Sequence, residues 1–296
     1  MTAFQLKIPS FSVIPNKIYL LFGAVKFEHT LFALPFAYIG MLLAGKGLPT
    51  LDQFIWISVA MVAARTLAMA SNRLIHHKED IANPRTAGRH LPRGLLKPWE
   101  MGLLMVLSAG LFFVSAAQLN FLALVLSPVA LVVVVFYSYA KYYTWTSHFV
   151  LGWADAIAPA GAWIGVTGNL DGQAVILACA VATWISGFDI LYSTQDYDFD
   201  SKYGIHSIPR RFGIGPALWW AKILHVLTAL SLIGLGMWME LGYFYYIGCG
   251  IAVVLLIYEH LLVSPKDLSR LGTAFFKVNS YVALILLLFT SLSVFV

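Results

Sequence analysis

Apolar segments of about twenty residues recur from residue 19 almost to the end of this chain, with short polar connections between them. A segment of that length and composition spans the hydrocarbon core of a bilayer as a helix. Sixty per cent of the 296 residues are apolar and 11% are charged, which is too little charge to coat a soluble domain of this size. The sequence therefore predicts an all-α, polytopic membrane protein that folds as a single domain over residues 1–296.

The hydrophobic pattern predicts about nine transmembrane helices. Their expected ranges are 19–44, 51–75, 99–117, 121–140, 146–167, 173–194, 216–237, 241–262 and 272–295. Short connections rich in Gly, Asn or Pro, such as Gly45–Pro49, separate many of them. The two cysteines, Cys179 and Cys249, lie within apolar segments and lack the spacing of metal ligands, so we interpret them as packing residues.

The basic residues of the connecting segments fall almost entirely on one side of the predicted bundle. That side holds Lys7, Lys17, Lys78, Arg85, Arg89, Arg93, Lys97, Lys141, Lys202, Arg210, Arg211, Lys266 and Arg270. The connections on the opposite side hold Lys46 alone. By the positive-inside rule the basic side is cytoplasmic. The sequence pI near 9.1 fits basic loops beside an anionic lipid bilayer, and nothing in the pattern indicates nucleic-acid binding.

Two polar stripes open on this same side, at the ends of the second and sixth spans. The first consists of Asn72, His76 and Asp80. The second consists of Asp189, Tyr192, Asp196 and Asp200. A Pro-Arg element follows each stripe, at Pro84-Arg85 and at Pro209-Arg210. Side chains spaced three or four residues apart share one helix face, so each stripe is expected to line one face of its helix.

Carboxylates concentrated in an apolar protein repel one another and lose hydration, so the stripes require a compensating partner. An acid within a helix, as Asp189 is expected to be, costs roughly 2.5–3.5 kcal/mol to place in a bilayer. Mg²⁺ is commonly held by a few carboxylates together with substrate phosphates, and arginine binds the remaining phosphate oxygens in a bidentate manner. The chain has no Gly-rich P-loop. A diphosphate with an apolar tail therefore suits this site better than a nucleoside triphosphate.

The two stripes resemble the Asp-rich motifs of the UbiA superfamily of intramembrane aromatic prenyltransferases, which follow helices 2 and 6 of a nine-helix fold. The first family motif is Asn-x-x-x-Asp-x-x-x-Asp, which aligns with Asn72, His76 and Asp80. The second is Asp-x-x-x-Asp, which aligns with Asp196 and Asp200. Three stretches are similar to the branch of 4-hydroxybenzoate polyprenyltransferases and their menaquinone-pathway counterparts: Phe27–Ala37, Asn83–Thr86 and Gln195-Asp196.

The resemblance implies Mg²⁺-dependent transfer of a polyprenyl chain from polyprenyl diphosphate to an aromatic acceptor, in respiratory quinone biosynthesis at a bacterial inner membrane. The distribution of basic residues predicts that the active site opens to the cytoplasm. It implies that the metal ligands, which are also the catalytic residues, are Asn72, Asp80, Asp196 and Asp200. A family Tyr-x-x-x-Lys pair beside the diphosphate matches Tyr137 and Lys141. The further residues expected to bind substrate are His76, Arg85, Asp189, Tyr192, Lys202 and Arg210.

His76 departs from the family pattern, because the family normally has aspartate at this position and imidazole is a poorer ligand for Mg²⁺. Three functional interpretations stay open: His76 donates a hydrogen bond to the diphosphate, Glu79 substitutes as a ligand, or fewer metal ions bind. A fourth is that His76 is an exposed histidine at a helix end, beside His77.

Other residues also keep two interpretations. Glu28 and His29 are expected either to bind the acceptor or remove its proton, or to pack helices, and Asp155 either to line the site or to form an internal hydrogen bond. Arg89 and Arg93 are expected to serve their loop or the anionic lipid surface. The alternatives for the whole chain are a naphthoate prenyltransferase and, in a different class, a proton-coupled transporter. The concentration of acids at one membrane face argues against the transporter.

Overall fold

Helices make up most of the part of the chain that the computed structural model describes, which is residues 13–26 and 30–296. Within those ranges, eight helices are long and apolar enough to cross a membrane, and a shorter apolar helical segment covers Leu34–Gly45. The prediction of an all-α membrane protein with about nine spans is therefore confirmed. The molecule is an integral membrane protein.

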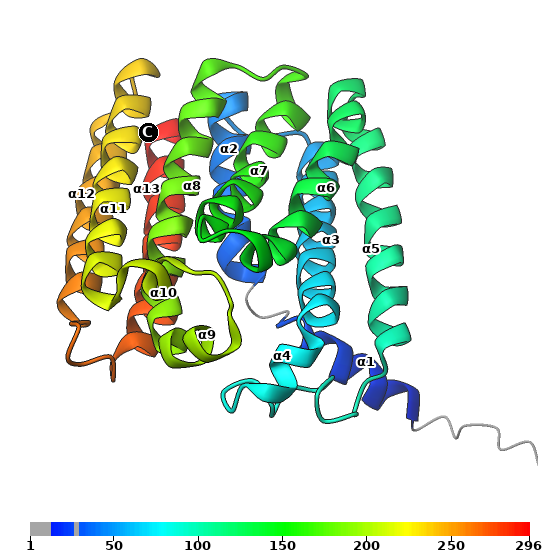
Figure 1. Cartoon of the computed structure of the whole chain (residues 1–296). Helices are drawn as coiled ribbons and strands as arrows, with labels where there is room; N and C mark the ends of the chain where they lie inside the picture. Colours follow the sequence, from blue (N-terminus) through cyan, green and yellow to red (C-terminus); the bar gives the residue numbers. More distant parts are fainter. Residues whose placement is uncertain (1–12, 27–29) are drawn as a thin grey trace, which may run out of the picture.

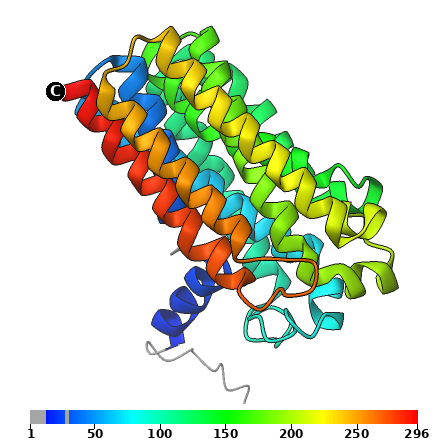
Figure 2. The same cartoon turned by 90° about the vertical axis from the view of Figure 1, so that its left-hand side faces the viewer.

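The long helices run side by side and the short elements gather at one end of the bundle (Figures 1 and 2). The long helices are α2 (Thr30–Gly45), α3 (Leu51–Ile75), α5 (Pro98–Leu119), α6 (Phe121–Tyr143), α7 (Ser147–Thr167), α8 (Gly172–Ser193), α11 (Ile214–Trp238), α12 (Tyr243–Leu261) and α13 (Asn279–Phe295). The short elements are α1 (Val13–Ala24), α4 (His77–Ala82), the 3₁₀ turn Thr194–Asp196, α9 (Tyr197–Tyr203), α10 (Ile208–Phe212) and the π-helical turn Thr273–Val278.

The prediction of one span over 19–44 is wrong, because two helices cover this region. Helix α1 ends at Ala24, Lys26 has the left-handed backbone angle φ of 52°, and α2 begins at Thr30. A left-handed residue cannot continue a right-handed helix. Lys17 anchors α1 to the end of the bundle, since its Nζ lies 3.1 Å from the Leu95 carbonyl and 3.1 Å from a Glu100 carboxylate oxygen. The predicted site candidates Glu28 and His29 lie outside the described residues.

Small residues allow the central helices to approach closely. A Cβ atom at Gly152 of α7 would clash with the Ala182 carbonyl and Ser186 Oγ of α8. A Cβ at Gly40 of α2 would likewise clash with the backbone of Pro159 in α7. Close backbone approach is a main source of helix association in lipid, where the hydrophobic effect contributes little. The contact between α7 and α8 fixes the spacing of the polar side chains that both helices carry at one end.

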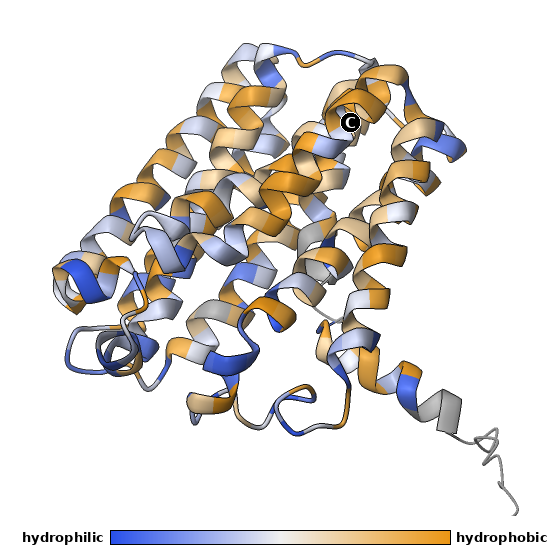
Figure 3. Ribbon diagram, turned by 45° about the vertical axis from the view of Figure 1, so that its right-hand side comes forward, coloured by the Kyte–Doolittle hydropathy of each residue, from blue (hydrophilic) through white to orange (hydrophobic). Residues whose placement is uncertain are grey.

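Both polar stripes coincide with breaks in a helix at the polar end of the bundle (Figure 3). Helix α3 ends at Ile75 and α4 follows from His77, while α8 ends at Ser193 and passes through a 3₁₀ turn into α9. Gly204, with φ of 78°, ends α9 and turns the chain back toward the bundle. These breaks let each segment continue across the end of the bundle, where its side chains meet those of the other.

Candidate active site

Two cavities adjoin inside the bundle. One has a volume of about 230 Å³, is lined mostly by polar side chains and lies at the end that carries α4 and α9. The other has a volume of about 390 Å³, is lined mostly by apolar side chains and is formed chiefly by α3, α6 and α7. Tyr137 and Leu151 line both cavities. A single elongated ligand with a polar head and an apolar tail could therefore occupy both spaces.

The polar cavity brings together most of the residues that the sequence singled out. Its lining includes Asn72, His76, Asp80, Arg85, Tyr137, Lys141, Asp189, Tyr192, Asp196 and Asp200. Two predicted residues lie outside this lining. Lys202 is exposed in the last turn of α9, with its amine over the Tyr203 ring, and Arg210 donates a hydrogen bond to the Ile205 carbonyl. Both follow the second stripe in sequence, but neither side chain reaches the wall of the polar cavity.

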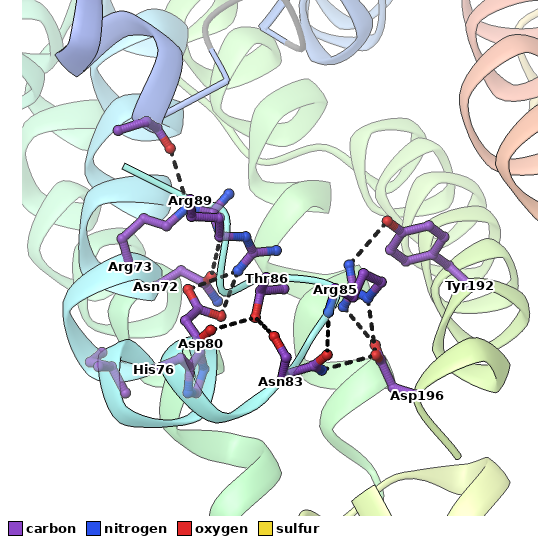
Figure 4. Close-up of polar contacts among 12 residues, drawn as sticks. Asn72, Arg73, His76, Asp80, Asn83, Arg85, Thr86, Arg89, Tyr192 and Asp196 are labelled. Atoms are coloured by element: carbon purple, nitrogen blue, oxygen red, sulfur yellow. Dashed lines mark hydrogen bonds and ion pairs between the residues drawn. The ribbon is translucent and has the colours of Figure 1, made fainter. Parts of the chain in front are cut away.

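Arg85, in the loop that follows the first stripe, binds two members of the second stripe (Figure 4). Its Nη2 lies 2.7 Å and its Nε 3.0 Å from the two carboxylate oxygens of Asp196, and its Nη1 donates to the Tyr192 hydroxyl at 3.3 Å. Asn83 also donates to Asp196, at 3.2 Å. Burial by itself would lower the pKa of Arg85, but the hydrogen bond and charge of Asp196 outweigh it and raise that pKa. The guanidinium is thus firmly cationic at the mouth of the site.

Asp80 is paired in the same way, with Arg89. The Arg89 Nη1 lies 2.7 and 2.8 Å from the two oxygens of the buried Asp80 carboxylate. Arg89 was expected to serve its loop or the lipid surface, and this pairing with an acid of the site was not predicted. The loop folds back after Thr86, whose hydroxyl donates to the Asp80 carbonyl at 3.1 Å, and this turn brings Arg89 over the acid. Arg93, in contrast, is exposed.

His76 is 2% exposed, so the interpretation of an exposed histidine at a helix end is wrong. Its Nδ1 lies 2.8 Å from the Tyr142 hydroxyl of α6. Burial lowers the pKa of His76 far below its ordinary value, and the charges of Lys141 and Arg73 lower it further. A neutral imidazole therefore ties the junction of α3 and α4 to α6.

Glu79 and Lys141 each carry a charged atom in the polar cavity that has no close partner among the described residues. Glu79 Oε2 is buried in the wall of the polar cavity and has no hydrogen-bond partner among the described residues. The Lys141 amine lines the same cavity and interacts electrostatically with Asp200, Asp80 and Asp196, yet no described side chain lies within ion-pair distance of it. An oxygen donor and a cation without partners in one cavity match a ligand that combines a metal ion with phosphate.

His148 is a site residue that sequence reasoning missed. Its Nδ1 lies 2.6 Å from Asp189, and its Nε2 accepts a hydrogen bond from the Ile208 backbone N–H at 3.3 Å. Because a backbone N–H can only donate, Nε2 carries no proton and Nδ1–H must donate to Asp189. The half-buried Asp189 of α8 thus has its partner in α7. A lone histidine in an apolar helix offers no sequence signal of this pairing.

The donor set suits Mg²⁺ more than a softer metal. Carboxylate and amide oxygens of Asn72, Asp80, Asp196 and Asp200 line one cavity, together with the orphaned Glu79 oxygen. Among the described residues, no three His, Cys, Asp or Glu side chains lie close enough to form a metal cage by themselves. Mg²⁺ commonly takes only a few protein carboxylates and completes its shell with water and substrate phosphates, so an incomplete cage fits it.

Comparisons with known proteins point to one family. Residues 33–281 match the model of the UbiA prenyltransferase family. The 4-hydroxybenzoate octaprenyltransferase of Vibrio parahaemolyticus is 30% identical over 83% of this chain and 86% of its own length. The apo structure of a UbiA homolog from Aeropyrum pernix K1 superposes with a TM-score of 0.81 at 31% identity, covering 88% of this chain and 95% of that one. A UbiA homolog from Archaeoglobus fulgidus, bound to GPP and Mg²⁺, shares the fold with a TM-score of 0.64 at 17% identity, covering 90% and 99%.

Proposed function

This chain belongs to the UbiA prenyltransferase family, and from that premise we propose that it transfers a polyprenyl chain from polyprenyl diphosphate to 4-hydroxybenzoate or a related hydroxy-aromatic acid, as a single domain over residues 1–296. One observation carries the proposal: a polar cavity rich in acids and bases adjoins a larger apolar cavity, with Tyr137 in the wall of both. The diphosphate occupies the first and the prenyl tail the second. Family membership favours this enzyme over the transporter alternative.

The residues of the polar cavity hold the donor head. Asn72, Asp80, Asp196 and Asp200, with Glu79, are the oxygen donors that would hold Mg²⁺ there. When bound, the metal neutralises the charge that gathers on the departing diphosphate. Lys141 supplies a cation without a protein partner, and Arg85 and Arg89 can turn from their carboxylates toward phosphate oxygens. These groups together favour cleavage of the bond between the allylic carbon and the diphosphate.

The junction of the cavities suits the second half of the reaction. The allylic carbon lies where the polar head meets the apolar tail, beside Tyr137. An electron-rich ring carbon of the acceptor bonds to this carbon as the diphosphate leaves, and the ring then loses a proton. The apolar walls formed by α3, α6 and α7 keep water from competing with the ring.

We also propose that the protein acts in respiratory quinone biosynthesis in a bacterial inner membrane, with the site open to the cytoplasm. The residues that line the polar cavity come from the end of the bundle that carries the basic connections, which the positive-inside rule assigns to the cytoplasm. Sealed inside-out vesicles that contain the protein should prenylate externally added acceptor with polyprenyl diphosphate. Activity restricted to right-side-out vesicles would contradict the orientation.

The reaction is tested with purified protein in membranes, geranyl diphosphate, Mg²⁺ and either 4-hydroxybenzoate or 1,4-dihydroxy-2-naphthoate. We expect prenylated 4-hydroxybenzoate, detected by mass spectrometry, and its loss when EDTA removes the metal. Product from the naphthoate alone would favour the menaquinone-pathway alternative. Absence of product from both acceptors, in protein that retains its folded helix content, would contradict the proposed function.

A further inference from the structure

A buried carboxylate lies where α8, α11, α12 and α13 pack together, outside the lining of both large cavities (Figure 1). Glu259, near the end of α12, is 0% exposed. Its Oε2 has no hydrogen-bond partner among the described residues, and His225 Nδ1 of α11 lies 3.7 Å away, beyond hydrogen-bond distance. An ionisable residue buried in a membrane protein is costly and marks a functional role by default, yet the proposed reaction does not use this one.

Asn279, the first residue of α13, connects this carboxylate to two further elements. Its Nδ2 donates to Glu259 Oε1 at 2.8 Å and to the Ala274 carbonyl at 3.3 Å. Its Oδ1 accepts from Trp184 Nε1 of α8 at 2.8 Å. An indole N–H can only donate, so Oδ1 must face Trp184 and the NH₂ group must face the carboxylate. This buried set, here called the amide clamp, therefore holds α8, α12 and the π-helical turn Thr273–Val278 together.

The turn that the amide clamp holds carries Phe276, which packs on a residue of the polar cavity. The Phe276 and Tyr192 rings meet edge to face, with centroids 6.0 Å apart. Tyr192 in turn contacts Arg85, whose Nη1 donates to the hydroxyl at 3.3 Å and whose guanidinium carbon lies 5.5 Å from the ring centre (Figure 4). π-Helical turns are rare and occur frequently at functional sites. A continuous series of contacts thus leads from the amide clamp to the cation at the mouth of the site.

We propose that Glu259 and Asn279 are positioning residues of the diphosphate site, which hold Phe276 against Tyr192 and thereby keep Arg85 at the mouth of the polar cavity. This inference rests on the proposed prenyl transfer, in which Arg85 turns from its carboxylate toward phosphate. Because Tyr192 contacts the guanidinium through its hydroxyl and its ring, Arg85 keeps this partner during the exchange. A tyrosine already fixed in one rotamer loses less entropy when the diphosphate binds, so the clamp strengthens donor binding.

The chain offers variants that separate positioning from general packing. Asn279→Leu keeps the side-chain size but removes every hydrogen bond of the clamp, whereas Glu259→Gln keeps an oxygen acceptor for the amide. Thr228→Val is the matched control. Its hydroxyl also forms a buried hydrogen bond between helices, to Thr183 Oγ1 at 2.9 Å, and its other hydrogen bond is to the Leu224 carbonyl of its own helix.

Steady-state kinetics with geranyl diphosphate and 4-hydroxybenzoate give the first test. We expect Asn279→Leu to raise the KM for geranyl diphosphate at least about fivefold and to leave the KM for 4-hydroxybenzoate within about twofold. Phe276→Leu should have the same effect, because it removes the ring contact while leaving the clamp intact. Glu259→Gln should stay within about twofold of wild-type protein, as should Thr228→Val. Equal rises of the donor KM in Asn279→Leu and Thr228→Val would overturn the proposal.

A double-mutant cycle with Arg85→Gln tests whether the effect passes through this arginine. If it does, adding Asn279→Leu to Arg85→Gln should raise the donor KM by no more than about a further twofold. A general loosening of the bundle would act independently of Arg85, so full multiplication of the two single effects would contradict the proposal while leaving the prenyl-transfer function intact.

Binding of inorganic diphosphate to the magnesium-loaded protein, measured by equilibrium dialysis, tests the clamp without turnover. Binding that Asn279→Leu and Phe276→Leu each weaken at least about fivefold, and that Thr228→Val leaves unchanged, supports the proposal even if no acceptor is prenylated. Phe276→Leu decides the result if Asn279→Leu does not fold. Equal binding by wild-type protein and Phe276→Leu, or binding by neither, contradicts the proposal.

Discussion

The two acidic segments, each consisting of a polar stripe and the loop that follows it, look alike in sequence but make different contacts in the structure. The second segment presents Asp196 and Asp200 to the polar cavity, whereas the first presents Asp80. The His76 imidazole of the first segment instead contacts Tyr142 of α6. The first segment presents fewer carboxylates but supplies two cations, because Arg85 and Arg89 both come from its loop. We therefore propose that the second segment mainly supplies oxygen donors for a metal, whereas the first adds cations that bind anions to its own oxygen donors.

This asymmetry also makes the two segments depend on each other. Arg85 of the first loop holds both oxygens of Asp196 in the second, and Asn83 donates to the same carboxylate. A carboxylate held by a bidentate arginine keeps one orientation until a ligand competes for either partner. Arrival of a metal and a diphosphate would exchange these pairs, with the acid moving to the metal and the arginine to phosphate. The resting contacts therefore prearrange the groups that the ligand needs.

The largest expected effect comes from the second segment. Asp196→Asn removes a carboxylate that would hold the metal, and we expect turnover to fall about 100- to 1000-fold, as when a charge that stabilises a leaving group is lost. Prenyl transfer at saturating substrate measures it. Asp198→Asn is the matched control, because this exposed acid, two residues away, does not line the cavity. Turnover at the wild-type rate in Asp196→Asn would show that this carboxylate does not hold the metal.

The next effect should come from the arginines of the first segment. Arg85→Gln removes a bidentate cation, so we expect the KM for geranyl diphosphate to rise about 10- to 100-fold, the equivalent of charge-assisted hydrogen bonds. Steady-state kinetics at fixed acceptor measures it, with Arg93→Gln as the control because Arg93 is exposed. A fall in turnover with an unchanged donor KM would mean that Arg85 only orients Asp196.

A smaller effect separates Glu79 from His76 within the first segment. Glu79→Gln should weaken Mn²⁺ binding about tenfold, because the orphaned Oε2 is an oxygen donor, whereas His76→Gln should weaken it less. Electron spin-echo spectra of protein loaded with Mn²⁺ should lack the signal of a directly bound imidazole nitrogen. Such a nitrogen signal in wild-type protein, lost in His76→Gln, would make His76 a ligand and restore the symmetry of the segments.

Sequence patterns predict the fold better than the pairing within the site. The spans follow from apolar segments long enough to cross a bilayer, and the stripes follow from helical spacing, so Asp80 and Asp196 could be singled out without coordinates. The break at Lys26 was not predicted, because the apolar residues on both sides of Lys26, Glu28 and His29 were interpreted as one span. The pairing of Arg89 with Asp80 and of His148 with Asp189 was also not predicted, because it depends on how the loop folds and how the helices pack.

The smallest expected effect is that of Lys202→Gln, which tests whether the second segment contributes a cation to the binding of the diphosphate. Lys202 follows Asp200 by two residues, but its side chain is exposed and its amine lies 5.7 Å from the centre of the Tyr203 ring, outside the cavity lining. Lys202→Gln should therefore change the KM for geranyl diphosphate by no more than about twofold, the usual range for an exposed side chain. Lys141→Gln is the contrasting variant, because its amine lines the cavity without a protein partner, and it should raise the same KM clearly more. If Lys202→Gln matched Lys141→Gln, the second segment would bind phosphate as well as metal, and the division of work between the two segments would fail.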